Sequence, residues 1–275
     1  MRIYFLSENK TDNPGIRAEH GLSIYIEAEE MNILFDTGAS DLFLDNAEKM
    51  NVDLNLADVC VISHGHYDHT EGVPSFCRLN ENADVIIHKD AFIKTYDMRS
   101  NGSLSEETTG IRWSDEVFDE IKDRLRLTEN ELWLTDSIVV SGTVHEIEGF
   151  KATESFYSVI DGEIVPDKMN HEQFLVIRQD DGIFVFSGCS HRGVIPILRH
   201  AKELFPGLPV KGLVAGMHLY SASAEVRKTV VDEVCGEDME MVIPVHCTGI
   251  NAICDLKARL GEKCIVATSG DIYEY

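Results

Sequence analysis

The sequence predicts a mixed α/β sandwich, with sheets inside and helices outside. Short runs of β-branched and aromatic residues recur along the chain, as strands of a folded core do. Segments with helical spacing of apolar residues alternate with these runs in the last third, whereas the first third is mostly consecutive strands. The chain has 275 residues, 44% of them hydrophobic, which suffices for a large core and excludes disorder for most of the chain.

The expected strands are short and mostly apolar. In chain order they are residues 2–6, 22–27, 32–35, 58–62, 84–88, 173–178, 182–187, 210–215, 241–245 and 263–267. Four helices are expected from apolar residues that recur every three or four positions. They span residues 40–50, 192–204, 221–235 and 249–260, and Gly261 is placed to end the last one.

The stretch from about residue 95 to 148 differs from its surroundings. Between residues 101 and 150 there are 12 acidic side chains and 4 basic ones. Ser114 is placed to cap a helix with one apolar stripe, formed by Val117, Phe118, Ile121 and Leu125. We expect an inserted helical flap on a single domain that spans residues 1–275. The alternative is a charged, solvated helix with no role at the site.

The net charge limits the partners. The chain has 24 Lys and Arg against 48 Asp and Glu, a net charge of −24, so nucleic acid and anionic membrane surfaces are not expected. No apolar run is long enough for a transmembrane helix, and the first residues do not resemble a secretory signal. Seven cysteines without a C-x-x-C pair indicate reduced thiols. We therefore expect a cytoplasmic protein with a small-molecule substrate; a homodimer is one arrangement that the sequence allows.

One motif concentrates metal-binding side chains. The strand at residues 58–62 runs directly into SHGHYDHTEG, which holds four donors within six residues: His64, His66, Asp68 and His69. Imidazoles and a carboxylate suit zinc, and iron or manganese also accept them. We expect one or two divalent ions, zinc first. His64 and His66 alternate and can face one ion, whereas Asp68 and His69 turn toward a second.

Three later motifs each follow an expected strand, so their side chains can converge at strand ends. They are SGCSHRG at 187–193, AGMHL at 215–219 and PVHCTG at 244–249. His191 and His246 are the candidates to complete the ligand set. The Cys189 thiolate is an alternative ligand.

The histidine motif, with FDTG upstream at residues 35–38, resembles the metallo-β-lactamase superfamily. The resemblance implies an αββα sandwich with a metal site at one edge. It assigns His64 and His66 to one metal, Asp68 and His69 to a second, and His246 as the last metal histidine. It also implies that Asp36 braces the site without binding metal.

One position departs from the superfamily pattern. Typical members have an aspartate that bridges both metals after a glycine, and here Cys189 follows Gly188. The middle histidine of the superfamily precedes that strand, where His171 stands. We favour His191 as the ligand over His171, and both remain candidates beside Cys189. Whether two metals are bridged is open.

Several motifs together resemble a subgroup described as 7,8-dihydropterin-6-yl-methyl-4-(β-D-ribofuranosyl)aminobenzene 5'-phosphate synthase-like proteins. The motifs are EHGLS at 19–23, FDTG, SHGHYDH, GCSH, MHL and HCTG. The resemblance implies work on pterin precursors and places Glu19, His20 and His218 near the pocket. The alternatives are a turn-capping pair for Glu19 and His20, and a packed polar side chain for His218.

The expected chemistry follows from the metal. Bound zinc lowers the pKa of water to about 7, so hydroxide is available at neutral pH. Asp68 is the expected ligand and orienting group for catalysis, and His218 a proton-transfer candidate. Arg17 and Arg192 are expected to add local positive charge.

Three functions are compatible with these residues. The first is a metal-dependent hydrolase that uses metal-activated hydroxide on a small phosphorylated or cyclic substrate. The second is a metal-dependent synthase that joins a dihydropterin to a ribofuranosylaminobenzene phosphate. The third is a non-catalytic sensor that binds metal or ligand.

Overall fold

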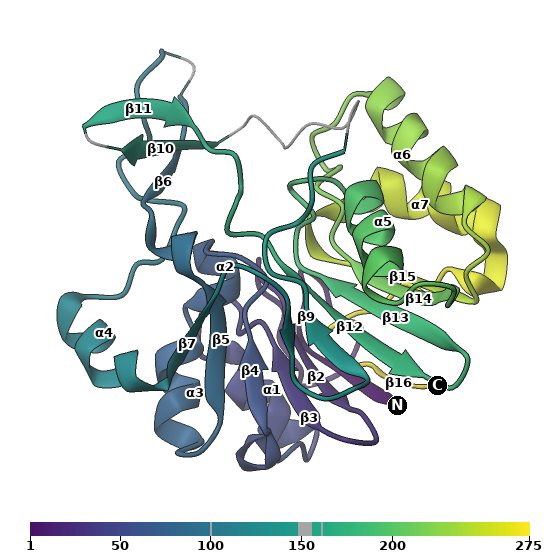
Figure 1. The fold of residues 1–275 in the computed structure, drawn as a ribbon, viewed down its shortest axis with the longest axis horizontal. Coiled ribbons are helices and arrows are strands. Elements are labelled where there is room, and N and C mark those ends of the chain that lie inside the picture. Colours follow the sequence, from purple (N-terminus) through teal and green to yellow (C-terminus); the bar gives the residue numbers. More distant parts are fainter. Residues whose placement is uncertain (100, 148–155, 161) are drawn as a thin grey trace.

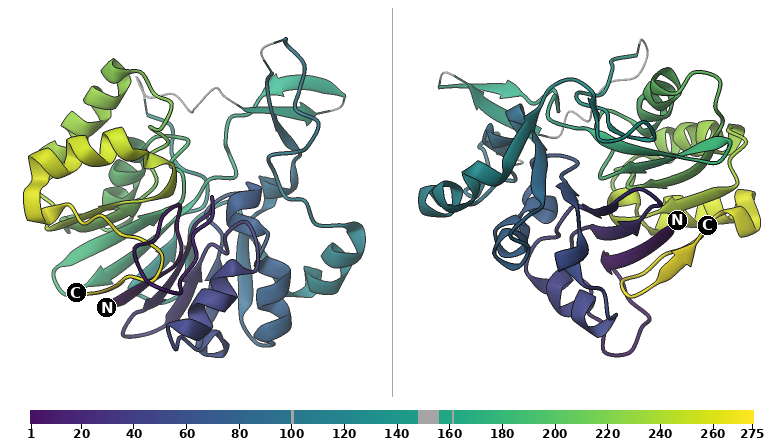
Figure 2. Two further views of the ribbon diagram at one scale, coloured as in Figure 1. Left: turned by 180° about the vertical axis from the view of Figure 1, so that it is seen from behind. Right: turned by 60° about the horizontal axis from the view of Figure 1, so that its bottom comes forward.

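The chain folds into four layers, with two sheets packed face to face and helices on both outer faces (Figures 1 and 2). The structure, a computed structural model, describes residues 1–99, 101–147, 156–160 and 162–275. The two ends of the chain meet, since the amino group of Met1 donates to the carbonyl oxygen of Tyr275 at 2.8 Å. The two packed sheets with helices on their outer faces confirm the predicted α/β sandwich.

The first sheet has seven strands, and its later half is parallel. Strands β3, β4, β5 and β7 run in one direction, so their carboxyl ends reach the same edge. Strand β1 is antiparallel to β2 and β2 to β3, so the carboxyl end of β1 also lies at that edge. In spatial order the strands are β16 (Ile272–Glu274), β1 (Arg2–Ser7), β2 (Ser23–Glu27), β3 (Asn32–Phe35), β4 (Val59–Val61), β5 (Asp84–His88) and β7 (Leu125–Thr128).

The second sheet has six strands. Strands β13, β14 and β15 are parallel neighbours, so three consecutive carboxyl ends lie side by side. In spatial order the strands are β15 (Met241–Pro244), β14 (Val210–Ala215), β13 (Gly182–Ser187), β12 (Phe174–Gln179), β9 (Ile138–Val140) and β8 (Leu132–Trp133). A separate small sheet projects beyond the sandwich in Figure 1; it consists of β11 (Glu163–Pro166), β10 (Phe156–Ile160) and β6 (Thr95–Asp97).

The helices cover the outer faces of both sheets. On the seven-stranded side are α1 (Leu42–Lys49), α3 (Val73–Leu79) and α4 (Asp115–Ile121), and on the six-stranded side α5 (Val194–Leu204), α6 (Ala224–Gly236) and α7 (Ile250–Leu260). The one-turn helix α2 (Tyr67–Thr70) lies at the sheet edge. Short 3₁₀ turns span Leu54–Leu56, Lys89–Phe92, Lys122–Arg124, His246–Thr248 and Gly261–Lys263.

The core lies between the two sheets. Phe35 from one sheet and Phe186 from the other are fully buried, and their ring centroids are 6.4 Å apart. Each such side chain contributes roughly 1.5–3 kcal/mol by leaving water. Further buried clusters pack the helices onto the outer faces, with Phe43 and Phe76 on one side and Leu198 and Leu256 on the other.

Most expected elements are present. All four expected helices form, and Gly261 ends α7 with a positive φ of 57°. Nine of the ten expected strands form within two residues of the expected ends. The strand expected at residues 263–267 was wrong: Cys264 makes one isolated bridge to Val242, and the chain then crosses to the other sheet to form β16.

The stretch from about residue 95 to 148, expected as an inserted helical flap, is helical only in part. Of the described residues in that stretch, Asp115–Ile121 form an α-helix. The Ser114 hydroxyl caps this helix by accepting from the amide of Val117 at 3.3 Å, but Leu125 belongs to β7. The strands β7, β8 and β9 complete the two main sheets, whereas β6 belongs to the separate small sheet. Residues 100 and 148 lie outside the described residues, and a single domain stays a prediction.

All seven cysteines are free thiols, which agrees with the expectation of no disulfide framework. Within the described ranges, no helix combines the length and the apolar character that spanning a bilayer requires.

Candidate metal centre

The candidate ligands lie where the carboxyl ends of several strands meet. Asp36 follows β3, the SHGHYDH motif follows β4, and Cys189 and His191 follow β13. His218 and His246 follow β14 and β15. Asp36, His218 and His246 have positive φ angles of 58°, 47° and 48°. Such backbone strain costs about 1–3 kcal/mol per residue and is concentrated at functional sites.

The loop between β4 and α2 presents its side chains because it passes close to a neighbouring turn. A Cβ on Gly65 would lie 2.5 Å from the carbonyl oxygen of Ala91, so this position requires glycine. His66 then caps α2 in an extended conformation, and the single helical turn carries Asp68 and His69.

His64, His66 and His191 form one cluster of imidazoles, here called the histidine group. Their ring centroids are 4.6 Å apart for His64 and His66, 5.0 Å for His64 and His191, and 4.8 Å for His66 and His191. Nε2 of His64 and Nε2 of His66 are buried and have no hydrogen-bond partner among the described residues. A buried polar atom without a partner is costly, and a metal ion would satisfy both nitrogens. The donor set therefore fits a metal.

Burial keeps the histidine group neutral. It lowers the pKa of His66 to about 3, and it lowers those of His64 and His191 well below the usual range. Neighbouring imidazoles act in the same direction. Neutral imidazole is the form that binds metal, so these rings are prepared as ligands near neutral pH.

Asp68, His20, His69 and His246 form a second cluster, here called the aspartate group. Oδ2 of Asp68 lies 3.1 Å from Nε2 of His246, 3.2 Å from Nε2 of His20 and 3.9 Å from Nε2 of His69. Burial opposes the charge on Asp68, but His69, His20 and His246 outweigh it and lower its pKa well below the usual range. Burial likewise opposes protonation of His246, but Asp68 and other neighbours raise its pKa to about 9.

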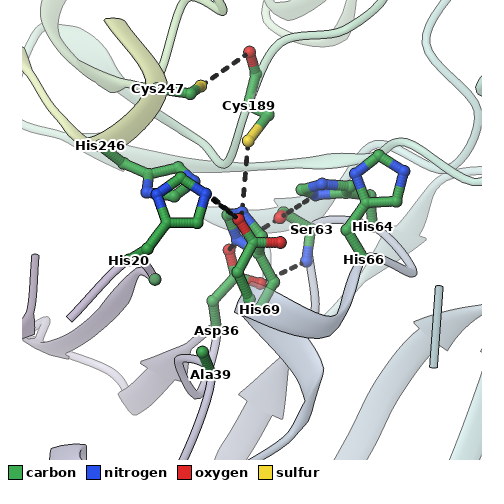
Figure 3. Close-up of polar contacts among 12 residues, drawn as sticks. His20, Asp36, Ala39, Ser63, His64, His66, His69, Cys189, His246 and Cys247 are labelled. Atoms are coloured by element: carbon green, nitrogen blue, oxygen red, sulfur yellow. Dashed lines mark hydrogen bonds and ion pairs between the residues drawn. The ribbon is translucent and has the colours of Figure 1, made fainter. Parts of the chain in front are cut away.

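Cys189 lies between the two groups. Figure 3 shows its side chain pointing onto His69, with His20 and His246 on one side and His64 and His66 on the other. Sγ of Cys189 is 3.3 Å from Nε2 of His69. Its sulfur also lies within 4.8 Å of donor atoms of His64 and His191, and separately of His69 and His246. Cys189 is thus placed to contact ions at both groups.

Asp36 holds the two groups in place from behind. Its buried carboxylate accepts from the amide and the hydroxyl of Ser63, each at 2.7 Å, and lies 2.6 Å from Nδ1 of His69. The Ser63 hydroxyl also lies 2.9 Å from Nδ1 of His64. One carboxylate therefore orients two candidate ligands, as expected of a group that braces metal-binding imidazoles.

The geometry favours Cys189 and His191 over His171. Nδ1 of His171 accepts from the amide of Gly65 at 3.0 Å, and Nε2 lies 3.7 Å from Asp167. Among the described side chains, Cys189 and His191 share a group of three metal-competent donors with His64, whereas neither His171 nor His66 belongs to such a group. His171 supports the loop that carries the histidine group.

Glu19 and His20 have different roles. Glu19 accepts from the amide of Ala39 at 3.0 Å and from the hydroxyl of Ser40 at 2.5 Å, so it caps the turn after Asp36. His20 contacts Asp68. Both His20 and His218 line the pocket. Glu19 thus has the turn-capping role that was the alternative. His20 and His218 lie at the pocket, where the resemblance placed them.

Two supporting residues were missed in the sequence. Oδ1 of Asn9 lies 2.8 Å from Nδ1 of His246, and Glu8 accepts from the amide of His246 at 2.6 Å. Both follow β1, whose carboxyl end lies at the same edge as the ligands. A polar pair directly after the first strand was the signal that could have indicated them.

The loop that carries Cys189 and His191 depends on a third missed residue. The buried carboxylate of Glu172 accepts from the amides of His191 and Arg192 at 2.6 and 2.7 Å. The Arg192 guanidinium donates to the Lys168 carbonyl and lines a separate cavity. Arg17 pairs with the surface residue Asp45. Neither Arg17 nor Arg192 is among the described residues that line the pocket, so their contribution of local positive charge stays a prediction.

A pocket of about 130 Å³ opens onto both groups. Phe156 is one of its lining residues, with ring centroids 4.5 Å from His66 and 5.2 Å from His191. None of the described residues that line it is a lysine or arginine. The lining residues are His20, His66, Tyr67, Asp68, Asp97, Thr109, Phe156, Cys189, His191, His218, Tyr220, His246 and Cys247.

Known proteins show the same fold and related sequences. A family model described as the metallo-β-lactamase superfamily matches residues 16–191. An uncharacterized protein of Methanocaldococcus jannaschii is 32% identical over 241 residues, which cover 87% of this chain and 88% of that protein. The 7,8-dihydropterin-6-methyl-4-(β-D-ribofuranosyl)-aminobenzene-5'-phosphate synthase of the same organism is 26% identical over 263 residues, covering 92% of this chain and 89% of the synthase.

A solved structure extends this likeness over the whole chain. Tm1679, described as a metal-dependent hydrolase of the β-lactamase superfamily, matches with a TM-score of 0.84 and 30% identity and covers 100% of this chain and 99% of its own. These relatives confirm the expectation of an enzyme and of a fold that binds divalent metal. The αββα layers, the H-x-H-x-D-H site at the sheet edge and the family match agree: the chain belongs to the metallo-β-lactamase superfamily.

Proposed function

We propose that the chain is a metal-dependent hydrolase that acts on a small phosphorylated or cyclic substrate. The observation that carries the proposal is the pair of buried Nε2 atoms on His64 and His66, which have no partner among the described residues. They lie beside Cys189 and His191, at the edge where a pocket reaches Asp68 and His246. Relatedness to a metal-dependent hydrolase over the full chain supports the same reaction class.

The two groups would each hold a divalent ion, zinc first. His64, His66 and His191, whose rings lie close together, would bind one ion, and Asp68, His69 and His246 a second. The sulfur of Cys189 lies near His64 and His191 in the first set and near His69 and His246 in the second. Such an ion supplies Lewis acidity, which makes water more acidic and polarises a carbonyl or phosphoryl oxygen.

The residues of the chain orient the reactants. Asp68 is 7% exposed and lines the pocket, so its carboxylate can accept a hydrogen bond from an attacking water. The side chain of His20 is 58% exposed and lies 3.2 Å from Asp68, so it connects this carboxylate with the solvent. His218 also lines the pocket and is the candidate to protonate a leaving group. Phe156 excludes water from the rings of His66 and His191.

The pocket limits the substrate. Its volume of about 130 Å³ is below the range of about 300–1,000 Å³ that is usual for drug-sized ligands. Tyr67, Phe156 and Tyr220 give it aromatic walls that suit a flat or apolar group. Because no lysine or arginine is among the described lining residues, a phosphate would be recognised by the metal and the histidines.

The second candidate is the synthase that joins a dihydropterin to a ribofuranosylaminobenzene phosphate. It is favoured by the 26% identity to such a synthase over 92% of the chain. Asp97 and Thr109 line the pocket and offer oxygen acceptors for the N–H groups of a heterocycle, and His218 would transfer the proton. The third function compatible with the sequence, a non-catalytic metal sensor, is disfavoured by the relatedness to enzymes and serves as the comparison in the assays.

Metal analysis and activity assays together distinguish the three. Protein purified without added metal is analysed for zinc, iron and manganese, and is tested on phosphomonoesters, phosphodiesters and lactones. It is also incubated with a dihydropterin and a ribofuranosylaminobenzene phosphate, and products are identified by mass spectrometry. Hydrolysis supports the first candidate, the coupled product supports the second, and bound metal without turnover supports the third.

Variants connect the activity to the site. His66→Ala is expected to lose bound metal and turnover together. The matched control is His145→Ala, because His145 is exposed, pairs with Glu203 and lies outside the site. Retained hydrolysis in His66→Ala would overturn the proposed function.

A further inference from the structure

Each of three adjacent parallel strands is followed by a residue whose side chain can bind a metal ion. Cys189 follows β13, His218 follows β14 and Cys247 follows β15. One donor atom from each, two sulfurs and one ring nitrogen, lie within 4.8 Å of one another. Cys189 and Cys247 are buried, and all three side chains line the pocket.

Backbone contacts hold the Cys247 side chain between His218 and Cys189. The amide of His218 donates to Sγ of Cys247 at 3.3 Å. Sγ of Cys247 also lies 3.6 Å from the carbonyl oxygen of Cys189, a contact drawn in Figure 3. Nδ1 of His218 is buried and has no hydrogen-bond partner among the described residues. His218 adopts a φ of 47°, so the backbone is strained where this ring is presented.

The local sequence keeps room for the second sulfur. Gly216 lies between β14 and His218, and a Cβ there would be 2.7 Å from Sγ of Cys247 and 2.3 Å from the carbonyl oxygen of Gly188. Only glycine therefore lets the Cys247 side chain lie against this backbone.

We propose that Cys189, His218 and Cys247 form a thiolate-rich metal position next to the histidine and aspartate groups, sharing Cys189 with them. Two thiolates and one neutral imidazole balance the charge of a divalent ion, which removes the cost of burying that charge. Sulfur donors select thiophilic ions, with zinc the commonest in proteins. The fourth ligand would come from the pocket that all three residues line.

This position goes beyond the proposed function, because it concerns ion binding and not the reaction. While an ion is bound there, His218 is a ligand and not the proton donor. Cys247 and His218 lie outside the H-x-H-x-D-H motif, and their role is distinct from that of His66. Loss of activity in His66→Ala therefore neither supports nor weakens it.

Cadmium titration of the metal-free protein tests the position. Cadmium bound to thiolate absorbs in the ultraviolet, and the amplitude at saturation counts the sulfur ligands. Cys247→Ser and Cys189→Ser are each expected to keep part of the wild-type amplitude, with the larger loss in Cys189→Ser because its sulfur is shared between groups. The double variant is expected to keep none. Cys254→Ser is the matched control, because Cys254 is exposed, and it should keep the full amplitude.

Two results would overturn the proposal. One is an unchanged amplitude in Cys247→Ser. The other is no remaining amplitude in Cys189→Ser, which would mean that Cys189 is the only sulfur ligand. Cys189→Ser keeps the test decisive if Cys247→Ser does not fold. His218→Gln should weaken cadmium binding while the sulfur amplitude at saturation stays the same; unchanged affinity would exclude His218 as a ligand.

Discussion

Nδ1 of His69 lies 2.6 Å from Oδ2 of the buried Asp36, which leaves Nε2 of that ring to face Cys189 at 3.3 Å. The same carboxylate holds Ser63, whose hydroxyl lies 2.9 Å from Nδ1 of His64. The orientation of His69 and His64 thus depends on Asp36, which is not itself a candidate ligand.

Asp36→Asn is expected to weaken metal binding by about 10- to 100-fold, the usual effect of losing a group that orients a metal-binding imidazole. The amide removes the charge and one acceptor, so it cannot satisfy Ser63 and His69 together. Competition with a chelating dye measures the affinity. Asp45→Asn is the control, because Asp45 is exposed and pairs with Arg17; equal affinity in both variants would contradict the role of Asp36.

Asn9→Ala is expected to lower the affinity of the aspartate group by about 10-fold or more, because His246 loses the oxygen 2.8 Å from its Nδ1. Asn9 contacts His20 and His246, which both belong to the aspartate group, so only part of the metal should be lost. Zinc content after dialysis measures this loss. Asn55→Ala is the control, because Asn55 lies in an exposed turn, and it should keep the wild-type zinc content. A wild-type zinc content in Asn9→Ala would mean that Asn9 does not position His246.

Gly216→Ala is expected to destabilise the fold by about 1–3 kcal/mol or more, because overpacking forces the backbone to move. The new Cβ would lie 2.3 Å from the Gly188 carbonyl oxygen and 2.7 Å from the Cys247 sulfur. Gly236→Ala is the control, because nothing lies within 4 Å of a Cβ there. Urea unfolding compares the two, and a wild-type midpoint for Gly216→Ala would show that the site tolerates the clash.

Stability should fall as the pH falls from about 6.5 toward 4. Burial lowers the pKa of His88 from 6.5 to about 4. In that range the unfolded chain binds a proton that the folded chain does not, so acid favours unfolding. Nδ1 of His88 accepts from the amide of Asp90 at 3.1 Å, which leaves Nε2–H to donate to the Thr143 hydroxyl at 2.8 Å.

The measurement is the unfolding temperature against pH, compared between wild type and His88→Gln. The variant carries no titrating group at residue 88, so its curve should be less steep between pH 6.5 and 4. Parallel curves would mean that His88 does not contribute to the acid sensitivity.

The sequence predicted the strands that carry long apolar runs and the ligands that crowd into one motif. Strands such as β9, with three residues, or β16, which has exposed side chains, have too little local signal to be recognised. They form because distant strands supply their hydrogen bonds. β7 has the sequence LRLT and is largely exposed. It lacks the apolar run of a buried strand, so its place at the edge of the seven-stranded sheet could not be inferred from the sequence.

The candidate site divides in the same way. His64, His66, Asp68 and His69 could be predicted because they lie within six residues. Glu172 could not, because it reaches the site only through the order of the strands. Cys247 stands next to the predicted His246, but its relation to Cys189 depends on how β13, β14 and β15 align.

The pairing of β1 with β16 has a consequence for folding. Arg2 pairs with Glu274, and Ser269 accepts from the amide of Glu8, directly before Asn9. The residues that hold His246 are therefore fixed only after segments more than two hundred and fifty positions apart have met. Contacts between such distant segments form slowly. Refolding should build the helices first and take up metal last, so the appearance of metal binding in a stopped-flow experiment would time the final closure of the chain.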